Sequence, residues 1–340
     1  AGEYADELAN LGVRVSNLEK KVGNLYWSGD ARMRYTASSL KDKKDAYDGR
    51  IRLNVKGQVN DATYVQGQFV NNMNFKDEAS SDTTMAQIYV NHNFNKNVAV
   101  RLGRQPIAFG NQGGWLYNGP EGYDGAQASY NNGKLSLTTG FGQLNASDMT
   151  DDTDDDGNVT SYGVTGTDMY FAKGAYDFGF AKLGADYVKF QGDTNSTDHY
   201  FAGQELYGIN LNIPVQKFNV FGEYWKNTTW GDYDTAWNAG LSYGKADWKK
   251  AGTWDLSVAY NDVDYGVYFG GGTWHNDMLK NLNNSKYIEA DNLTFWTAIA
   301  NVTLQKNVQL HAEYAFGADA EGTEGVDPDD SWTVSLNYKF

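Results

Sequence analysis

The sequence contains no cysteine, only four prolines and four histidines. It also lacks any apolar run of about 18 residues, the length that a transmembrane helix requires. Without cysteine the chain can form no disulfide bond, no zinc–thiolate site and no thiol nucleophile. The absence of a long apolar run does not exclude a membrane barrel, because strands of about 10 residues that alternate apolar and polar side chains keep the mean hydropathy low. Here the mean hydropathy is −0.61.

Positive charge is also scarce. The chain has 28 Lys and Arg against 43 Asp and Glu, a net charge of −15, which argues against nucleic-acid binding because phosphates need basic partners. Aromatic residues are abundant at 15%, with 24 Tyr and 10 Trp, and there are 38 Gly. This composition suits a membrane barrel with aromatic girdles and many turns. No secretory signal is visible, so we expect an exported protein to appear here in processed form.

Residues 1–25 differ from the rest of the chain. Their apolar residues follow an alternating spacing of three and four, which predicts a coiled-coil helix. Arg14 and Glu19 frame a pattern that resembles the R-h-x-x-h-E motif of three-stranded coiled coils. The alternative is a helix packed on its own domain. The predicted trimer stalk consists of Leu8, Leu11, Val15, Leu18, Val22 and Leu25.

From residue 26 onward the pattern has period two. Ile51, Leu53 and Val55 alternate with Arg50 and Arg52, as in a strand with one apolar and one polar face. A soluble β-sandwich could share this pattern, with its polar face in water. About sixteen such strands are predicted, with starts near residues 28, 49, 62, 84, 98, 123, 135, 167, 181, 205, 218, 234, 253, 291, 308 and 331.

The connections between these strands alternate between short turns and long acidic loops. The long ones are residues 39–48, 72–83, 106–122, 144–166, 191–203, 226–233, 264–290 and 317–330. This layout is typical of an even-stranded outer-membrane barrel, with both termini on the short-turn, periplasmic side. We therefore predict an all-β transmembrane barrel over residues 26–340, preceded by the stalk.

The C-terminal segment Trp332–Phe340 places a large apolar residue at every second position and ends on Phe340. The alternative is an ordinary amphipathic strand. The ending resembles the terminal strand signal of bacterial outer-membrane proteins. That resemblance implies that Tyr338 and Phe340 are read by the barrel-assembly machinery.

Strand number, loop alternation and the terminal Phe340 together resemble general diffusion porins over residues 26–340. With the preceding stalk, the chain resembles the OmpM-type tether porins. This resemblance implies a homotrimer in outer-membrane lipid with a periplasmic N-terminus. In that family a surface-layer-homology domain binds the cell wall. This chain has no such domain, so a link to the cell wall would need residues that precede it.

A porin selects solutes at a constriction lined by charges. In sixteen-stranded porins the third long loop folds into the lumen, so we expect residues 106–122 to form the constriction. We predict a transverse field between arginines on the wall and carboxylates at the loop. Arg104 breaks the alternation of its strand and would mark a bulge or the loop root. The alternative is that the arginines pair with scattered luminal carboxylates and set no selectivity. The predicted constriction residues are Arg32, Arg34, Arg50, Arg52, Arg101, Glu121 and Asp124.

One acidic loop carries a weak calcium signal. Asp152, Asp154 and Asp156 match the opening of a calcium-binding loop, but Gly163 stands where a bidentate Glu is expected. A solvated acidic loop is the better interpretation, and no cofactor is expected.

The barrel and its charged lumen predict passive diffusion of small hydrophilic solutes, and three other functions are compatible with the sequence. The first is a purely structural outer-membrane anchor. The second is a barrel enzyme, such as a phospholipase or protease, for which His311 and Glu313 share a strand face. The third is a substrate-specific channel, with an aromatic slide formed by Trp115, Tyr117 and Tyr123. Acidic loops favour cations at the mouth, whereas the arginines favour anions at the neck.

Overall fold

The computed structural model describes residues 7, 11, 23–40, 43–76, 83–110, 114–145, 152–153, 159–161, 166–192, 201–270, 272, 274–283, 290–322 and 327–340. Most of the predicted stalk, including Leu8, Val15, Leu18 and Val22, lies outside these residues. Leu11 is described and its side chain is 56% exposed. No helix among the described residues is long and apolar enough to cross a bilayer.

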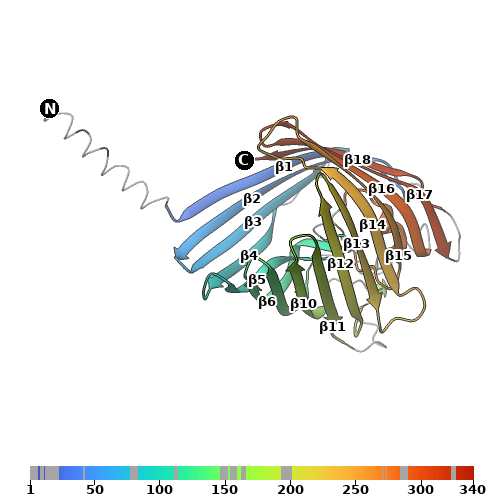
Figure 1. Ribbon diagram of the computed structural model, residues 1–340, viewed down its shortest axis with the longest axis horizontal. Helices are drawn as coiled ribbons and strands as arrows, with labels where there is room; N and C mark the ends of the chain where they lie inside the picture. Colours follow the sequence, from blue (N-terminus) through green and yellow to red (C-terminus); the bar gives the residue numbers. More distant parts are fainter. Residues whose placement is uncertain are drawn as a thin grey trace.

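Sixteen antiparallel strands of the described chain close into one barrel, in which β1 pairs with both β2 and β18 (Figure 1). The first seven barrel strands are β1 (Leu25–Ala37), β2 (Ala46–Asn60), β3 (Thr63–Asn74), β4 (Thr83–Asn93), β5 (Val98–Phe109), β6 (Tyr117–Asn131) and β7 (Leu135–Leu144). The other nine are β10 (Asp168–Asp177), β11 (Lys182–Phe190), β12 (Glu205–Val215), β13 (Phe218–Asn227), β14 (Thr235–Gly244), β15 (Trp254–Asp264), β16 (Ala290–Gln305), β17 (Val308–Gly322) and β18 (Ser331–Lys339). The pair β8 (Asp152–Thr153) and β9 (Val159–Ser161) forms a separate two-stranded sheet, and η1 (Met278–Asn283) is a 3₁₀ helix.

The predicted barrel is confirmed in strand number and in the alternation of its connections. Two boundaries are corrected. Leu25, predicted to end the stalk, opens β1 and pairs with Gly57. The third loop is much shorter than expected, because β5 and β6 stay paired as far as Phe109 and Tyr117. A register shift beside Pro106 lets the strand accept a residue that has no N–H to donate.

The two faces of the barrel wall differ in side-chain chemistry. Ile51, Leu102 and Ile209 are exposed on the outer face, at 43%, 55% and 58%. Gln87 and Asn261, on the inner face, are buried. Because side chains alternate along a strand, this segregation extends around the barrel. An apolar exterior around a polar interior is the inverse of a soluble sandwich, so the sandwich interpretation is wrong.

Exposed aromatic side chains form two belts on the outer face. One belt lies beside the short turns and the other beside the long connections. Within β13, Phe218 and Tyr224 belong to opposite belts, and within β18 Tyr338 and Trp332 do the same. Six residues of strand separate the members of each pair, which is roughly 20 Å at 3.4 Å per residue. Because barrel strands tilt by about 40°, the two belts lie roughly 15 Å apart along the barrel axis, with apolar side chains between them.

The C-terminus completes the barrel. The backbones of Phe340 and Gly29 exchange two hydrogen bonds, at 2.7 and 3.0 Å. The ring of Phe340 covers Gly29 so closely that a Cβ there would lie 2.5 Å from Phe340 Cε2. The last residue therefore closes the seam between β18 and β1.

Candidate functional site

A ladder of charges lines the inner face of β1 and β2. Arg34 Nε donates to Asp48 Oδ2 at 2.7 Å, and Arg32 Nη2 lies 3.4 Å from the same carboxylate. On the next rung, Asp30 accepts from Arg52 Nε at 2.9 Å and lies 3.5 Å from Arg50 Nη2. Four arginines thus share two carboxylates. We call Arg32, Arg34, Arg50, Arg52 and Arg101 the arginine wall.

Arg101 extends this wall onto β5. Its Nε donates to Asn91 Oδ1 at 3.0 Å, and its guanidinium lies 5.0 Å from the ring centre of Tyr89. The arginines do pair with luminal carboxylates, as the alternative held, but the wall keeps an excess of positive charge. The sequence analysis did not single out Asp30 and Asp48, although Asp30 shares a strand face with Arg32 and Arg34, and Asp48 shares one with Arg50 and Arg52.

The hairpin formed by β5 and β6 folds into the lumen and reaches the opposite wall. At its tip, Gly110 N donates to Asp186 Oδ2 on β11 at 3.1 Å. The ammonium group of Lys173 on β10 donates to the carbonyl of Ala108. Glu223 on β13 lies against Gly110, where a Cβ would approach Oε2 to 2.7 Å. The third loop therefore lies inside the barrel, as predicted, although most of it is strand.

Aromatic rings pack around this hairpin. Phe109, which is fully buried, has its ring centre 5.8 Å from that of Phe171 and 6.4 Å from that of Trp225. Phe269, from the connection between β15 and β16, lies 6.0 Å from Phe109 and stacks on Tyr117 at 5.0 Å. Three connections, between β5 and β6, between β11 and β12 and between β15 and β16, share one buried apolar cluster with the strands from β5 to β7 and from β10 to β17. We call this cluster the aromatic plug.

The aromatic plug corrects the slide hypothesis. Trp115, Tyr117 and Tyr123 are each 0–1% exposed. Trp115 packs against Trp274 at 6.3 Å, and Tyr123 packs against Phe171 at 5.3 Å. Rings buried in this way stabilise the plug and offer no face to a passing solute.

Residues 274–283, which we call the inward segment, are fixed to the β1 and β18 side of the barrel. Asp277, nearly buried, accepts from Ser39 N and Ser39 Oγ at 2.9 Å each, from Ser38 Oγ at 2.6 Å and from Ser331 Oγ at 3.1 Å. Nothing in the sequence signalled this anchor, because its partners come from connections and strand ends that are far apart in the chain.

A second anchor joins the inward segment to β17. Glu313 Oε2 accepts from the backbone N–H groups of His275 and Asn276, at 2.7 and 2.8 Å. Arg32 Nη1 lies 3.2 Å from His275 Nε2. Burial lowers the pKa of His275 to about 3, against the opposing effect of Glu313, so the ring is neutral at physiological pH.

Both ring nitrogens of His311 are occupied, which bears on the enzyme hypothesis. His311 Nδ1 lies 2.7 Å from Asn301 Oδ1, and Nε2 lies 2.9 Å from Glu313 Oε1. A general base needs a ring nitrogen that can accept a proton from the nucleophile. In this arrangement both ring nitrogens of His311 face oxygens of Asn301 and Glu313, so neither is directed at the hydroxyl group of a nucleophilic side chain.

Asp124, one of the two predicted loop carboxylates, does not face the arginine wall. Asp124 forms a bidentate ion pair with Arg104, with both N–O distances at 2.8 Å. Both residues lie on the outer face, since Arg104 is opposite Ile88, whose side chain is 52% exposed. Glu121 is half-buried and acts electrostatically on Arg104. The prediction of Asp124 opposite the wall is wrong because β6 continues through it and strand parity turns its side chain outward.

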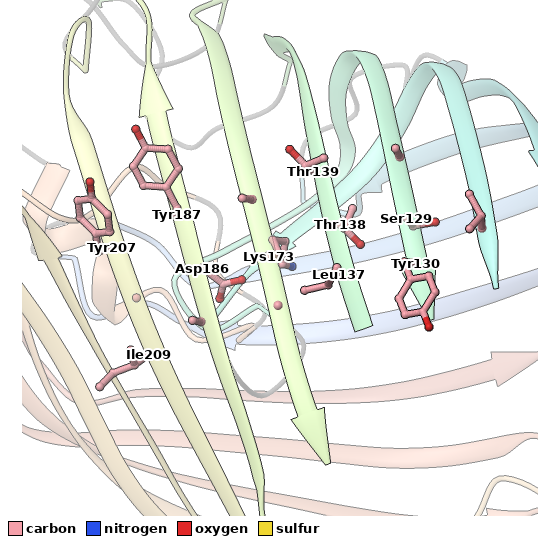
Figure 2. Close-up of a pocket in the computed structure, with 16 residues that line it drawn as sticks. Ser129, Tyr130, Leu137, Thr138, Thr139, Lys173, Asp186, Tyr187, Tyr207 and Ile209 are labelled. Carbon is pink, nitrogen blue, oxygen red and sulfur yellow. The ribbon is translucent and has the colours of Figure 1, made fainter. Parts of the chain in front are cut away.

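A groove of about 690 Å³ crosses strands β5–β7 and β10–β12 (Figure 2). Its floor consists of small side chains, and Tyr187, Tyr207 and Ile209 lie along one side. These residues share the outer face with exposed Leu137. The groove therefore lies on the outer face of the barrel and does not form part of a path through it.

The weak calcium candidate is only partly described. Asp152 lies in β8, which pairs with β9. Asp154 and Asp156 lie outside the described residues, so the proposed ligand set stays a prediction.

No protein-family description matches the sequence, and neither does any curated protein. Solved structures do match the fold. OprB of Pseudomonas putida superposes with a TM-score of 0.61 at 11% identity, covering 97% of this chain and 96% of its own. A mutant of the Rhodopseudomonas blastica porin superposes with a TM-score of 0.58 at 10% identity, covering 93% and 100%.

A third similar structure is the trimer form of OmpT, an outer-membrane protein of Vibrio cholerae. It has a TM-score of 0.57 at 12% identity and covers 93% of this chain and 99% of its own. These identities are low, so the likeness concerns the fold. The chain has the fold of bacterial outer-membrane porins along nearly its whole length.

Proposed function

We propose that this chain is an outer-membrane porin through which small hydrophilic solutes and ions diffuse passively. The observation that carries the proposal is the closed barrel with an apolar outer face, two aromatic belts and a charged inner face. A barrel of sixteen strands is wide enough for an aqueous channel. The N-terminus would then lie on the periplasmic side with the short turns, and Tyr338 and Phe340 would serve barrel assembly.

The path for solutes runs along the arginine wall. The aromatic plug fills the lumen next to β10–β17, which leaves the β1–β5 side for water. Along that side four guanidinium groups share the two carboxylates of Asp30 and Asp48, and Arg101 adds a fifth positive charge. A constriction of this charge attracts anions and repels cations. We therefore propose that the narrow part of the channel prefers small anions, with Arg32, Arg34, Arg50, Arg52 and Arg101 as its lining.

Three copies would assemble through their walls and the predicted stalk. The heptad spacing of the stalk supports this, and a fold neighbour is described in a trimer form. A tether to the cell wall through residues upstream of the stalk extends the same proposal.

Planar-bilayer recording of the purified protein tests the channel. We expect stepwise conductance increases, and in a salt gradient a reversal potential of the sign set by anion flow. A purely structural anchor would insert without conductance steps. A reversal potential of the opposite sign would retain the channel but overturn the role of the arginine wall.

A further inference from the structure

Three metal-ligating side chains meet where the inward segment touches β17. His311 and Glu313 project from the inner face of β17, and His275 comes from the inward segment. One ligand atom from each lies within 4.8 Å of the other two. Glu313 Oε1 is 2.9 Å from His311 Nε2 and 3.7 Å from His275 Nδ1. The whole of β16 lies in the sequence between His275 and the other two ligands, so only the fold brings His275 to them.

The surrounding groups hold these ligands in a fixed orientation. Glu313 Oε2 accepts three N–H groups, from His275 N, Asn276 N and Asn276 Nδ2, at 2.7–2.8 Å. That leaves Oε1 facing the two imidazole rings. Outer hydrogen bonds of this kind orient the ligands of metal sites.

The tautomer of His311 follows from its neighbours. Asn301 Nδ2 donates to Asp255 Oδ1 at 2.7 Å, so Asn301 presents its oxygen to His311 Nδ1. That oxygen accepts a hydrogen bond from Nδ1, so Nε2 faces Glu313 Oε1 at 2.9 Å, where a proton or a metal ion can join the two atoms.

His275 Nδ1 points into the same space and has no hydrogen-bond partner, although it is buried. We propose that His275, His311 and Glu313 bind a divalent transition-metal ion of the zinc class inside the lumen. Two imidazoles and one carboxylate suit zinc, whereas calcium and magnesium prefer oxygen ligands alone. Zinc bonds of about 2.0–2.1 Å place tetrahedral ligand atoms roughly 3.3 Å apart, and the distances of 2.9 and 3.7 Å bracket that value.

Arg32 competes with the metal for the imidazole ring of His275. Its Nη1 lies 3.2 Å from His275 Nε2, and donation to that nitrogen places the ring proton on Nδ1. When Nδ1 binds the metal, the proton moves to Nε2 and Arg32 must turn away. Asp48, 3.4 Å from Arg32 Nη2, is available to receive it. Removing the guanidinium should therefore strengthen metal binding.

Bound metal would fasten the inward segment to the wall beside the solute path. This consequence for conductance rests on the proposed channel function, whereas metal binding does not. Calorimetry can therefore confirm metal binding even if the bilayer recordings show no channel, and the recordings can show a channel that metal does not affect.

Titration calorimetry of the folded full chain with zinc chloride tests the site, after metal has been removed with a chelator. We expect one zinc ion per chain, with magnesium and calcium giving no heat at the same concentrations. His275→Ala, His311→Ala and Glu313→Gln should each abolish this binding. Asn301→Ala should weaken it about 10- to 100-fold, and Arg32→Ala should tighten it.

His92→Ala is the matched control, because His92 bonds to Thr63 on another strand and shares no contact with the site. His275 lies outside the barrel strands, so its alanine variant keeps the test valid if a β17 variant does not fold. No zinc binding to the parent chain, or binding that His275→Ala leaves intact, would overturn the proposal. In bilayers, zinc should change single-channel conductance of the parent but not of His275→Ala.

Discussion

The two sides of the barrel interior use the same strand alternation for opposite purposes. On β1 and β2, inward positions carry arginines that form ion pairs with Asp30 and Asp48; Arg34, Arg50 and Arg52 keep partial exposure, whereas Arg32 is buried. From β10 to β17, inward positions nearest the long connections carry Phe171, Trp225 and Phe295, which are 0–2% exposed. The difference lies in what covers each side: the β5–β6 hairpin and the segment around Phe269 pack over the aromatic side, whereas on the β1 side the inward segment covers Arg32 and leaves Arg50 and Arg52 half-buried.

This contrast shows that strand parity alone does not define a pore lining. An inward side chain lines a water path only where no connection folds over it. The plug side gains stability from apolar packing, whereas the wall side keeps charges that need hydration or ion pairs. Substitutions on the plug side should therefore change mainly the free energy of unfolding. Substitutions on the wall side should change mainly the ion selectivity.

The largest effect is expected at the centre of the plug. Phe109→Ala removes a fully buried ring that contacts Phe171, Trp225 and Phe269. Such a truncation costs about 3–5 kcal/mol and should free the hairpin tip. We expect a larger and noisier single-channel conductance and a lower midpoint of thermal unfolding. Phe141→Ala is the control, since that ring is 57% exposed on the outer face. Unchanged conductance with Phe109→Ala would show that the hairpin does not narrow the channel.

A smaller effect is expected at the anchor of the inward segment. Asp277→Ala leaves the N–H of Ser39 and the hydroxyls of Ser38 and Ser331 without their acceptor. Losing a buried acceptor costs about 1–3 kcal/mol, enough to open the segment without unfolding the barrel. Limited proteolysis should cleave the variant within residues 265–289 faster than the parent. Asp247→Ala, in the short connection between β14 and β15, should leave this cleavage rate unchanged.

Charge on the wall should affect selectivity more than stability. Arg50→Ala removes one of two arginines that share Asp30. A unit charge about 4 Å from an ion in water contributes about 1 kcal/mol, so the anion-to-cation permeability ratio should fall about fivefold. The reversal potential in a salt gradient measures this ratio. Arg104→Ala removes the same charge from the outer face and should leave the ratio unaltered.

Much of this architecture follows from local sequence pattern. Alternation predicts the strands because each residue faces either lipid or lumen, and strand starts such as Val98 and Phe218 are placed correctly. The pattern also places Arg32 and Arg50 on the inner face. The strand positions and the inward direction of these arginines follow from two facts: side chains alternate along a strand, and a charge on the lipid-facing side is costly.

The rest depends on contacts between distant segments. The extension of β6 to Tyr117 was missed because Pro106 and several glycines look like a loop, yet a register shift keeps the strands paired. The anchor at Asp277 and the meeting of His275 with Glu313 join segments that no local pattern connects. Such contacts follow from how the connections fold into the lumen, which strand alternation does not specify.

The smallest effect is expected at Asp124, and it separates the outer face from the arginine wall most directly. Asp124→Asn weakens the ion pair with Arg104, whose two side chains are 42% and 38% exposed. A pair this exposed contributes about 0–1 kcal/mol, so unfolding should shift little. Because Asp124 faces away from the lumen, the reversal potential should stay at the parent value. A shift in the direction opposite to that of Arg50→Ala would instead place this carboxylate in the solute path, with β6 turned by one residue.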